Sequence, residues 1–252
     1  MNGKLIENLI PKWLKDRINP EVSSLNKFMA FVSSQVKSTD LVLDAGAGDC
    51  QYKKFFNHAK YESTDFDDVF DTSYKNKHTF VCSLDNIPKK DKNYDVIINT
   101  QVLEHVPNPQ KVLNELNRVL KPNGKLFLTT PQCWGIHGKE PYNYFFFTKF
   151  GLKELLENAG FKIKFIKPRG GIFWLLGTMS TTLPMYIFHQ HVFSKKSGKN
   201  ILKKNLTALI TWPFYLVSIP LFVLLIPIIC YYLDFLDKEK KFTLGYECYC
   251  TK

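Results

Sequence analysis

The amino-acid sequence predicts an α/β fold in which short strands and helices alternate to build a parallel β-sheet. Two observations favour this fold. Apolar runs of strand length alternate with segments of helical periodicity, and a glycine-rich turn directly follows the first run. The chain has 252 residues, of which 45% are hydrophobic, so it fits one α/β domain with an appendage, or two small domains. A charged fraction of 23% argues against global disorder.

The strands and helices are expected in a regular order along the chain. In that order, they are an amphipathic helical region over 5–36 that breaks near Pro11 and Pro20, a strand at 41–43, a helix opening within 49–57, strands at 61–65, 79–83 and 94–99, a helix at 109–120, a turn at 122–124, a strand at 125–130, a helix at 148–159, and strands at 161–167 and 242–251. Ligands bind such sheets at the carboxyl ends of the strands. This rule points to the turn after Leu43, to Asp65, to Ser83 and to residues 99–105.

The glycine-rich turn D-A-G-A-G suggests a particular class of cofactor. Gly46 and Gly48 allow a sharp turn and a close approach by a ligand. Asp65 follows Asp44 by 21 residues and ends the next strand, a placement that suits a ribose hydroxyl pair. A dinucleotide site requires G-x-G-x-x-G, but position 51 is Gln, and an acid within the turn repels phosphate. An acid there favours a cation such as the ammonium of a methionine moiety, so the turn predicts S-adenosylmethionine rather than NAD.

Three longer stretches carry a family resemblance. V-L-D-A-G-A-G, Y-D-V-I-I-N-T-Q-V-L-E-H-V and L-N-R-V-L-K-P-N-G-K-L-F-L-T-T-P resemble successive motifs of the class I methyltransferases. The resemblance spans roughly residues 40–167 and is strongest to the small-molecule branch, which includes ubiquinone-biosynthesis-like enzymes and enzymes of polysaccharide gene clusters. It implies an S-adenosylmethionine-dependent methyltransferase. The implied fold is a Rossmann-like seven-stranded sheet whose last strand is antiparallel and inserts beside the sixth.

The resemblance also implies roles for individual residues. The expected cofactor-binding residues are Asp44, Gly46 and Gly48 at the methionine part, Asp65 at the ribose, Ser83 and Leu84 beside adenine, and Gln101 below the methyl group. Two positions depart from the family pattern. Ser83 stands where an acid often accepts from the adenine amino group, and Cys50 replaces the third glycine of the first motif. We expect both to be tolerated, with weaker adenine recognition at Ser83.

Two histidines are candidate general bases. Methyl transfer depends mainly on proximity and orientation, but hydroxyl or amine acceptors also need a base. His105 follows the fourth strand and His137 follows the fifth, so both are expected to face the site. The alternative is that each histidine orders a loop, and Glu104 is expected to order a loop or cap a helix. No metal site is expected, because the six cysteines form no C-x-x-C pair and no histidine cluster has zinc spacing.

An aromatic segment over 132–148 lies between the fifth strand and the next helix. It resembles the acceptor loop of methyltransferases from polysaccharide gene clusters, although it lacks their arginine near Phe146. Aromatic acceptor pockets suit sugars by stacking and lipids by burial. The alternative is an aromatic core patch beneath a loop.

An apolar insertion over 172–240 is expected between strands six and seven. Residues 206–233 carry no charge and are long enough to cross a bilayer core of about 30 Å as a helix. Both ends of the insertion belong to one domain, so the number of crossings is even. The flanking basic residues are Lys195, Lys196, Lys199, Lys203, Lys204, Lys238, Lys240 and Lys241. Two crossings would put the first five outside, against the positive-inside tendency, so a re-entrant or interfacial insertion at the cytoplasmic face is expected. The alternative is a soluble helical cap or dimer face.

The sequence therefore predicts three regions and one main function. The regions are a helical cap over 1–39, a methyltransferase domain over 40–171 and 241–252, and a membrane-associated insertion over 172–240. The expected function is methylation of a lipid-linked sugar or similar amphiphile at the membrane. Quinone or isoprenoid methylation is one alternative, and a non-catalytic, cofactor-binding scaffold of a glycan-assembly complex is another. The net charge of +11 is expected to favour binding to an anionic lipid surface rather than to nucleic acid, because the lysines cluster beside the insertion and no N-P-P-Y-type motif occurs.

Overall fold

A computed structural model describes residues 11–66, 78–133, 135, 142–184, 186 and 213–252. The chain divides into two compact units. The sheet unit comprises Leu25–Arg169 and Leu244–Lys252, and the apolar unit comprises Met1–Ser24 and Gly170–Thr243. The boundary between them falls within helix α3 (Pro20–Ser34).

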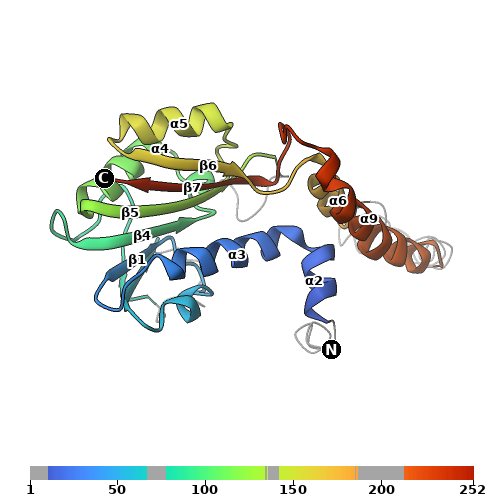
Figure 1. The fold of residues 1–252 in the computed structure, drawn as a ribbon, viewed down its shortest axis with the longest axis horizontal. Helices are drawn as coiled ribbons and strands as arrows, with labels where there is room; N and C mark the ends of the chain where they lie inside the picture. The colour runs from blue at the N-terminus through green and yellow to red at the C-terminus, as the bar shows by residue number, and fades with distance from the viewer. Residues whose placement is uncertain (1–10, 67–77, 134, 136–141, 185, 187–212) are drawn as a thin grey trace, which may run out of the picture. The chain divides into compact units, whose positions relative to one another are not determined.

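The sheet unit contains a seven-stranded sheet with the order β3-β2-β1-β4-β5-β7-β6 (Figure 1). The strands are β1 (Leu41–Ala45), β2 (Lys60–Asp65), β3 (Phe80–Val81), β4 (Tyr94–Thr100), β5 (Leu120–Pro131), β6 (Lys162–Pro168) and β7 (Gly245–Thr251). β7 runs antiparallel to β5 and β6, and the other pairs are parallel. The expected Rossmann-like sheet with an antiparallel last strand is thereby confirmed.

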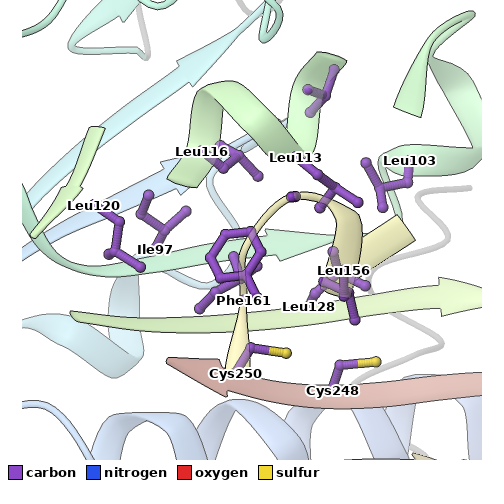
Figure 2. Packing of buried hydrophobic residues seen from close by; sticks show 14 of the residues in the cluster. Ile97, Leu103, Leu113, Leu116, Leu120, Leu128, Leu156, Phe161, Cys248 and Cys250 are labelled. Atoms are coloured by element: carbon purple, nitrogen blue, oxygen red, sulfur yellow. The ribbon is translucent and has the colours of Figure 1, made fainter. Parts of the chain in front are cut away.

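Helices cover both faces of this sheet. Helices α4 (Pro109–Val119) and α5 (Lys149–Asn158) lie on one face, and the part of α3 in the sheet unit lies on the other (Figure 1). Figure 2 shows the first layer, where Leu113 and Leu116 of α4 pack with Leu128 and Cys248 of the sheet. On the opposite face, α3 contributes a second buried cluster. Its members include Phe28, Met29, Val32, Val42, Ile98 and Phe127. Two apolar layers therefore hold the sheet and fix the carboxyl ends of its strands.

Capping residues fix where the two helices begin. The Asn108 side chain accepts a hydrogen bond from Lys111 N at 3.1 Å, and Pro109 occupies the first turn of α4. Thr148 caps α5 in the same way by accepting from Gly151 N at 3.1 Å. These local signals explain why both helices start within a residue of their predicted positions.

Three local predictions differ from the structure. The helix expected within 49–57 is only a 3-10 turn, η1 (Lys53–Phe56), because Cys50 has a positive φ of 60° that a right-handed helix does not accommodate. The third strand is shortened to β3. The turn expected at 122–124 lies within β5, where the pairing steps from Tyr94↔Leu120 to Val96↔Lys125 as a bulge.

The apolar unit combines a helix from the N-terminal region with helices from the predicted insertion. It contains α2 (Lys12–Ile18), α6 (Ile172–Ser180) and a continuous helical stretch Pro213–Leu236. That stretch comprises the π-helical turn η4 (Pro220–Leu225), α9 (Ile226–Leu233) and η5 (Asp234–Leu236), with ordinary helix before it. It lies between β6 and β7 in the sequence, as predicted, and its length and mean hydropathy of 2.5 are sufficient for a membrane span.

Close packing joins α6 to α9 within the apolar unit. A Cβ atom added at Gly177 would lie 2.9 Å from the Cβ of Cys230, so only glycine permits this helix spacing. The Ser180 hydroxyl, at the far end of α6, donates to Phe222 O at 2.9 Å. The lysines of the insertion between 195 and 204 lie outside the described residues.

Candidate functional site

The glycine-rich turn after β1 has the conformation that its sequence requires. Gly46 has a φ of 84°, and a Cβ atom there would overlap the Val102 side chain. The backbone N–H groups of Gly46 and Ala47 both donate to Thr64 O, at 2.9 and 3.0 Å. Gly48 has a φ of 53°, and a Cβ atom there would meet nothing within 4 Å. The turn is therefore held against β2 while its Gly48 end faces open space.

A cavity of about 300 Å³ lies over this turn at the carboxyl ends of β1, β2 and β4. Its described lining residues are Gly46, Ala47, Gly48, Asp49, Gln51, Tyr52, Asp65, Thr100, Gln101, Val102 and His105. The volume lies at the lower end of the range of small-molecule sites, roughly 300–1,000 Å³. The structure thus brings together five predicted site residues from three strand ends.

Asp65 is the acid of this cavity. Its Oδ2 accepts a hydrogen bond from Gly48 N at 2.6 Å, and its Oδ1 accepts from Phe66 N at 2.7 Å. An ionised carboxylate offers about four acceptor positions, so each oxygen keeps a lone pair for a ligand. The two backbone bonds orient the carboxylate, and the remaining lone pairs suit the two hydroxyl hydrogens of a ribose.

Asp44 lies beneath the turn and is only 1% exposed. Its Oδ2 accepts a hydrogen bond from the Tyr61 hydroxyl at 2.5 Å. Burial raises the pKa of Asp44 to about 7, with a smaller contribution from the negative charge of Asp65, while the Tyr61 hydrogen bond acts in the opposite direction. Asp44 therefore changes its charge near neutral pH, directly behind the glycine-rich turn.

The two residues expected beside adenine, Ser83 and Leu84, are outside the described lining of this cavity. Asp44 is also not among the described residues that line the cavity. Leu84 is buried in the core cluster beneath α4, and Ser83 is exposed, with its hydroxyl donating to Asp85 Oδ1 at 2.6 Å. Asp85 thus places a carboxylate two residues beyond the position where the family often has an acid.

Two residues at the end of β4 shape the cavity wall. Gln101 has a φ of 55°, a sparsely populated conformation that is typical of functional sites. Its backbone N–H donates to Thr129 O at 2.9 Å, and its Nε2 donates to Thr129 Oγ1 at 3.2 Å. The neighbouring Thr100 Oγ1 is buried and has no hydrogen-bond partner among the described residues.

His105 lies at the rim of the cavity in the 3-10 turn η3 (Leu103–His105). Its Nδ1 lies 2.5 Å from Tyr142 O. Because a carbonyl oxygen only accepts hydrogen bonds, Nδ1 carries a hydrogen, which places the lone pair of the neutral ring on Nε2. This Nε2 lies 3.8 Å from Oε1 of the buried Glu104 carboxylate. His105 therefore has the tautomer of a general base acting through Nε2, and the carboxylate stabilises the proton gained there. His137 lies outside the described residues.

Glu104 ties the aromatic segment to the rim of the cavity. Its backbone carbonyl accepts hydrogen bonds from Tyr144 N at 2.7 Å and Phe145 N at 3.3 Å. Its fully buried carboxylate accepts from Thr130 Oγ1 at 3.4 Å. Four rings of the tethered segment are well exposed. They are Tyr142, Tyr144, Phe145 and Phe146. The backbone of Glu104 therefore holds the segment, and the first of the exposed rings belongs to Tyr142, whose carbonyl binds His105.

Sequence reasoning gave no individual role to three residues of this site. Tyr61 alternates with Ser63 and Asp65 along β2, and this period-2 pattern was a signal that they share one side of the sheet. Thr100 precedes the predicted Gln101, and Tyr52 follows the glycine-rich turn. The strand-end rule pointed to residues 99–105, which include Thr100. No local sequence signal marks Tyr52 as part of a site.

Cys50 occupies a backbone conformation that favours glycine, with a φ of 60°, while its Sγ lies 3.6 Å from His78 Nδ1. We expect Cys50→Gly to increase the free energy of unfolding by about 1 kcal/mol, because a left-handed conformation costs a side-chain-bearing residue about 1–2 kcal/mol. Urea denaturation measures the change, with Cys82→Ala as the control thiol substitution. A loss of stability in Cys50→Gly would show that the contact with His78 outweighs the backbone strain.

Comparison with known proteins agrees with this geometry. Residues 22–164, more than half of the chain, match the family described as methyltransferase domain. The chain is 31% identical over 125 residues to a ubiquinone biosynthesis O-methyltransferase of Pasteurella multocida, covering 47% of each protein. It is 33% identical over 87 residues to a probable S-adenosylmethionine-dependent methyltransferase of Mycolicibacterium smegmatis, covering 32% of this chain and 34% of that protein. The matches thus span half or less of these curated relatives.

Two solved structures share the fold across most of the chain. A putative sarcosine dimethylglycine methyltransferase from Galdieria sulphuraria has a TM-score of 0.56 at 17% identity, covering 90% of this chain and 85% of that one. A SAM-dependent methyltransferase from Archaeoglobus fulgidus has a TM-score of 0.53 at 13% identity, covering 94% and 97%. Together with the family match, the sheet order and the glycine-rich turn facing Asp65, these similarities show that the chain belongs to the class I S-adenosylmethionine-dependent methyltransferases.

Proposed function

We propose that this protein transfers a methyl group from S-adenosylmethionine to a hydroxyl group of an amphiphilic acceptor, such as a lipid-linked sugar, at the cytoplasmic face of a membrane. One observation carries the proposal: the rim of the cavity that holds Asp65 also holds His105, which binds the start of an exposed aromatic segment. A cofactor site, a base and an apolar surface are thus adjacent in one unit.

The residues of the sheet unit fit the cofactor. Asp65 offers two carboxylate oxygens to the ribose hydroxyls, and the space over Gly48 admits a ligand that a Cβ atom would crowd. When bound, S-adenosylmethionine supplies the activated methyl group. His105 Nε2 accepts the proton that the acceptor hydroxyl loses as its oxygen becomes the nucleophile.

The acceptor class follows from the aromatic segment and from the apolar unit. Tyr142, Tyr144, Phe145 and Phe146 are each exposed by about two fifths, which suits stacking on a sugar or burial of an isoprenoid chain. The helical stretch Pro213–Leu236 has the composition of a membrane segment, and little of it is buried. An acceptor anchored in the membrane accounts for both features.

A quinone or isoprenoid acceptor is the second candidate. It is favoured by the printed name of the curated relative from Pasteurella multocida, a ubiquinone biosynthesis O-methyltransferase. That relative matches only over about half its length, so its substrate is a hypothesis for this chain. The two acceptors differ in one practical respect, because mild acid releases a sugar from a lipid phosphate but leaves a methylated quinone intact.

Methyl-labelled S-adenosylmethionine and detergent-purified protein, incubated with membrane extracts, test the proposal. We expect label to enter the organic phase and to move to the aqueous phase after mild acid hydrolysis. Acid-stable organic label would select the quinone. If extracts of every lipid class stay unlabelled although the protein binds S-adenosylmethionine, the enzyme proposal fails and the scaffold becomes the better reading. The scaffold also predicts that Asp44→Asn abolishes cofactor binding while glycan assembly continues.

The affinity for S-adenosylmethionine is expected to depend on pH through Asp44. The cofactor carries positive charge, so binding strengthens as pH rises through the pKa of Asp44, about 7, and the carboxyl ionises. In Tyr61→Phe the carboxylate loses a hydrogen bond that lowers this pKa. The midpoint of the affinity profile therefore moves to higher pH. Calorimetric titrations from about pH 5.5 to about pH 9 measure both midpoints.

The same shift has a consequence for the stability of the cofactor-free protein. The pKa of Asp44 is higher in the folded state than the usual value of 3.8, so the folded state binds the extra proton between these two values. The contribution of Asp44 to stability is therefore lost as pH rises from about 4 to about 7. For the affinity profile, equal pH midpoints in the wild type and in Tyr61→Phe would show that Asp44 does not cause the pH dependence of S-adenosylmethionine binding. Tyr215→Phe, on the apolar unit, is the matched control.

A further inference from the structure

An arginine surrounded by aromatic rings is the most elaborate feature of the apolar unit. The Arg17 guanidinium carbon lies 5.5 Å from the ring centroid of Trp13, 5.6 Å from that of Tyr231 and 5.3 Å from that of Tyr232. Arg17 Nε donates to the Tyr232 hydroxyl at 2.6 Å, and Nη1 donates to Trp13 O at 2.6 Å. We call Trp13, Arg17, Tyr231 and Tyr232 the arginine–aromatic cluster.

A second layer connects this cluster to α6. The Trp174 ring stacks on Tyr231 with centroids 5.3 Å apart, and its Nε1 donates to Tyr231 O at 3.3 Å. Helices α2, α6 and α9 therefore meet at one level. Trp13 and Tyr232 are nonetheless 58% and 55% exposed, so the outer surface of the cluster is available to a partner.

The cluster marks a sharp change in the chemistry of the chain. On its N-terminal side, the helix from Pro213 carries no charge, and many of its apolar side chains are exposed. They include Phe214, Leu216, Val217, Leu221, Leu224, Leu225 and Ile229. On its C-terminal side come charged residues within a few positions. They are Asp234, Asp237, Lys238, Glu239, Lys240 and Lys241. Helix α2 adds the basic residues Lys12, Lys15 and Arg17.

Carboxylates fix the start of α6 at the same level. Asp234 Oδ1 accepts from Gly171 N at 2.9 Å and from Trp174 N at 3.1 Å, and Asp237 Oδ2 accepts from Ile172 N at 2.8 Å. The start of α6 contacts Asp234, while Ser180 at its end contacts Phe222 O. Helix α6 therefore runs antiparallel to the helical stretch Pro213–Leu236. At about 1.5 Å per residue, the 9 residues of α6 reach roughly 13 Å from this level, close to the half-thickness of a bilayer core of about 30 Å.

We propose that the arginine–aromatic cluster is the headgroup-level anchor of the apolar unit in an anionic phospholipid leaflet. Tryptophan and tyrosine favour the membrane–water interface, and lysine and arginine bind anionic headgroups. The exposed side chains before Tyr231 lie among the acyl chains. Helix α2 lies in the interface with its basic residues toward the headgroups. This inference rests on the membrane location in the proposed function, not on methyl transfer.

Flotation of the full-length protein with lipid vesicles tests the choice of lipid. We expect at least tenfold tighter binding to vesicles of phosphatidylcholine with phosphatidylglycerol than to phosphatidylcholine alone. Arg17→Gln is expected to weaken binding to the anionic vesicles about fivefold, the equivalent of about 1 kcal/mol for one basic residue. Lys164→Gln, on the edge strand β6 of the sheet unit, removes the same charge and is expected to leave binding unchanged. Equal binding to both vesicle types would overturn the proposal.

A depth measurement tests the anchor without disturbing Arg17. In a variant that combines Trp134→Phe, Trp174→Phe and Trp212→Phe, Trp13 is the one remaining tryptophan. Its fluorescence is expected to be quenched more strongly by lipids brominated near the headgroup end of the acyl chain than by lipids brominated deep in the chain. Deep quenching, or none, would contradict the headgroup level. Titration of S-adenosylmethionine into the same preparation reports on the sheet unit, so failed methyl transfer with intact vesicle binding would reject the proposed function alone.

Discussion

Asp65→Ala is expected to bind S-adenosylmethionine at least about 100-fold more weakly than the wild type. A hydrogen bond to a charged group contributes about 1.5–3 kcal/mol, and Asp65 offers lone pairs for two ribose hydroxyls. The substitution also removes the acceptor of Gly48 N and so loosens the turn on which the cofactor lies. Both effects act in the same direction. Titration calorimetry at fixed pH measures the loss.

Two further variants separate the causes. Asp65→Asn keeps an oxygen acceptor but loses the charge, so it is expected to fall between the wild type and Asp65→Ala. Glu154→Ala removes an exposed carboxylate on α5, far along the chain from the cavity residues, and is expected to bind normally. A folded Asp65→Ala protein with unchanged affinity would remove the ribose assignment.

Local motifs explain why this part of the site was predictable. The turn at Gly46 and Gly48 and the acid at Asp65 are each encoded within a few residues of a strand end, and parallel strands bring their carboxyl ends to one edge. The same logic placed Gln101 and His105 beside them. The strand–helix alternation predicted the sheet for the same reason, since each element follows from its own periodicity.

Contacts between distant residues explain what the sequence did not reveal. The burial of Asp44 against Tyr61 depends on the register of β1 and β2, which pairs Asp44 with Ser63. The region over 1–39 was expected to be one helical cap, but α2 is in the same compact unit as α9. Arg17 of α2 contacts Tyr231 and Tyr232, which lie 214 and 215 positions further along the chain. The hydrophobic periodicity of a sequence does not indicate contacts between residues so far apart in the chain.

His105→Ala is expected to lower kcat for a hydroxyl acceptor about 100-fold or more, with little change in the affinity for S-adenosylmethionine. General-base catalysis contributes about 10²–10⁴-fold, and Nε2 of His105 has the lone pair that this role requires. At saturating S-adenosylmethionine, where the ionisation of Asp44 no longer affects the rate through cofactor binding, the acidic limb of the pH–rate profile is expected to disappear with it. Methyl-transfer rates across the pH range, with the acceptor identified from membrane extracts, provide the measurement.

The contact with Tyr142 makes a second variant decisive. His105 also donates to Tyr142 O and so orders the aromatic segment, which is a purely structural role. In His105→Asn, the amide N–H replaces the Nδ1–H donor but has no basic lone pair. If His105 only orders the segment, His105→Asn recovers most of the lost activity. If it is the base, His105→Asn stays as slow as His105→Ala. His58→Asn, which replaces a histidine bonded to Val36 O outside the cavity, shows whether losing any such imidazole slows the enzyme. Three results together assign proton removal to His105: His105→Asn is slow, His58→Asn is normal, and the acidic limb of the pH–rate profile is missing. A histidine that only orders the loop would not give all three results.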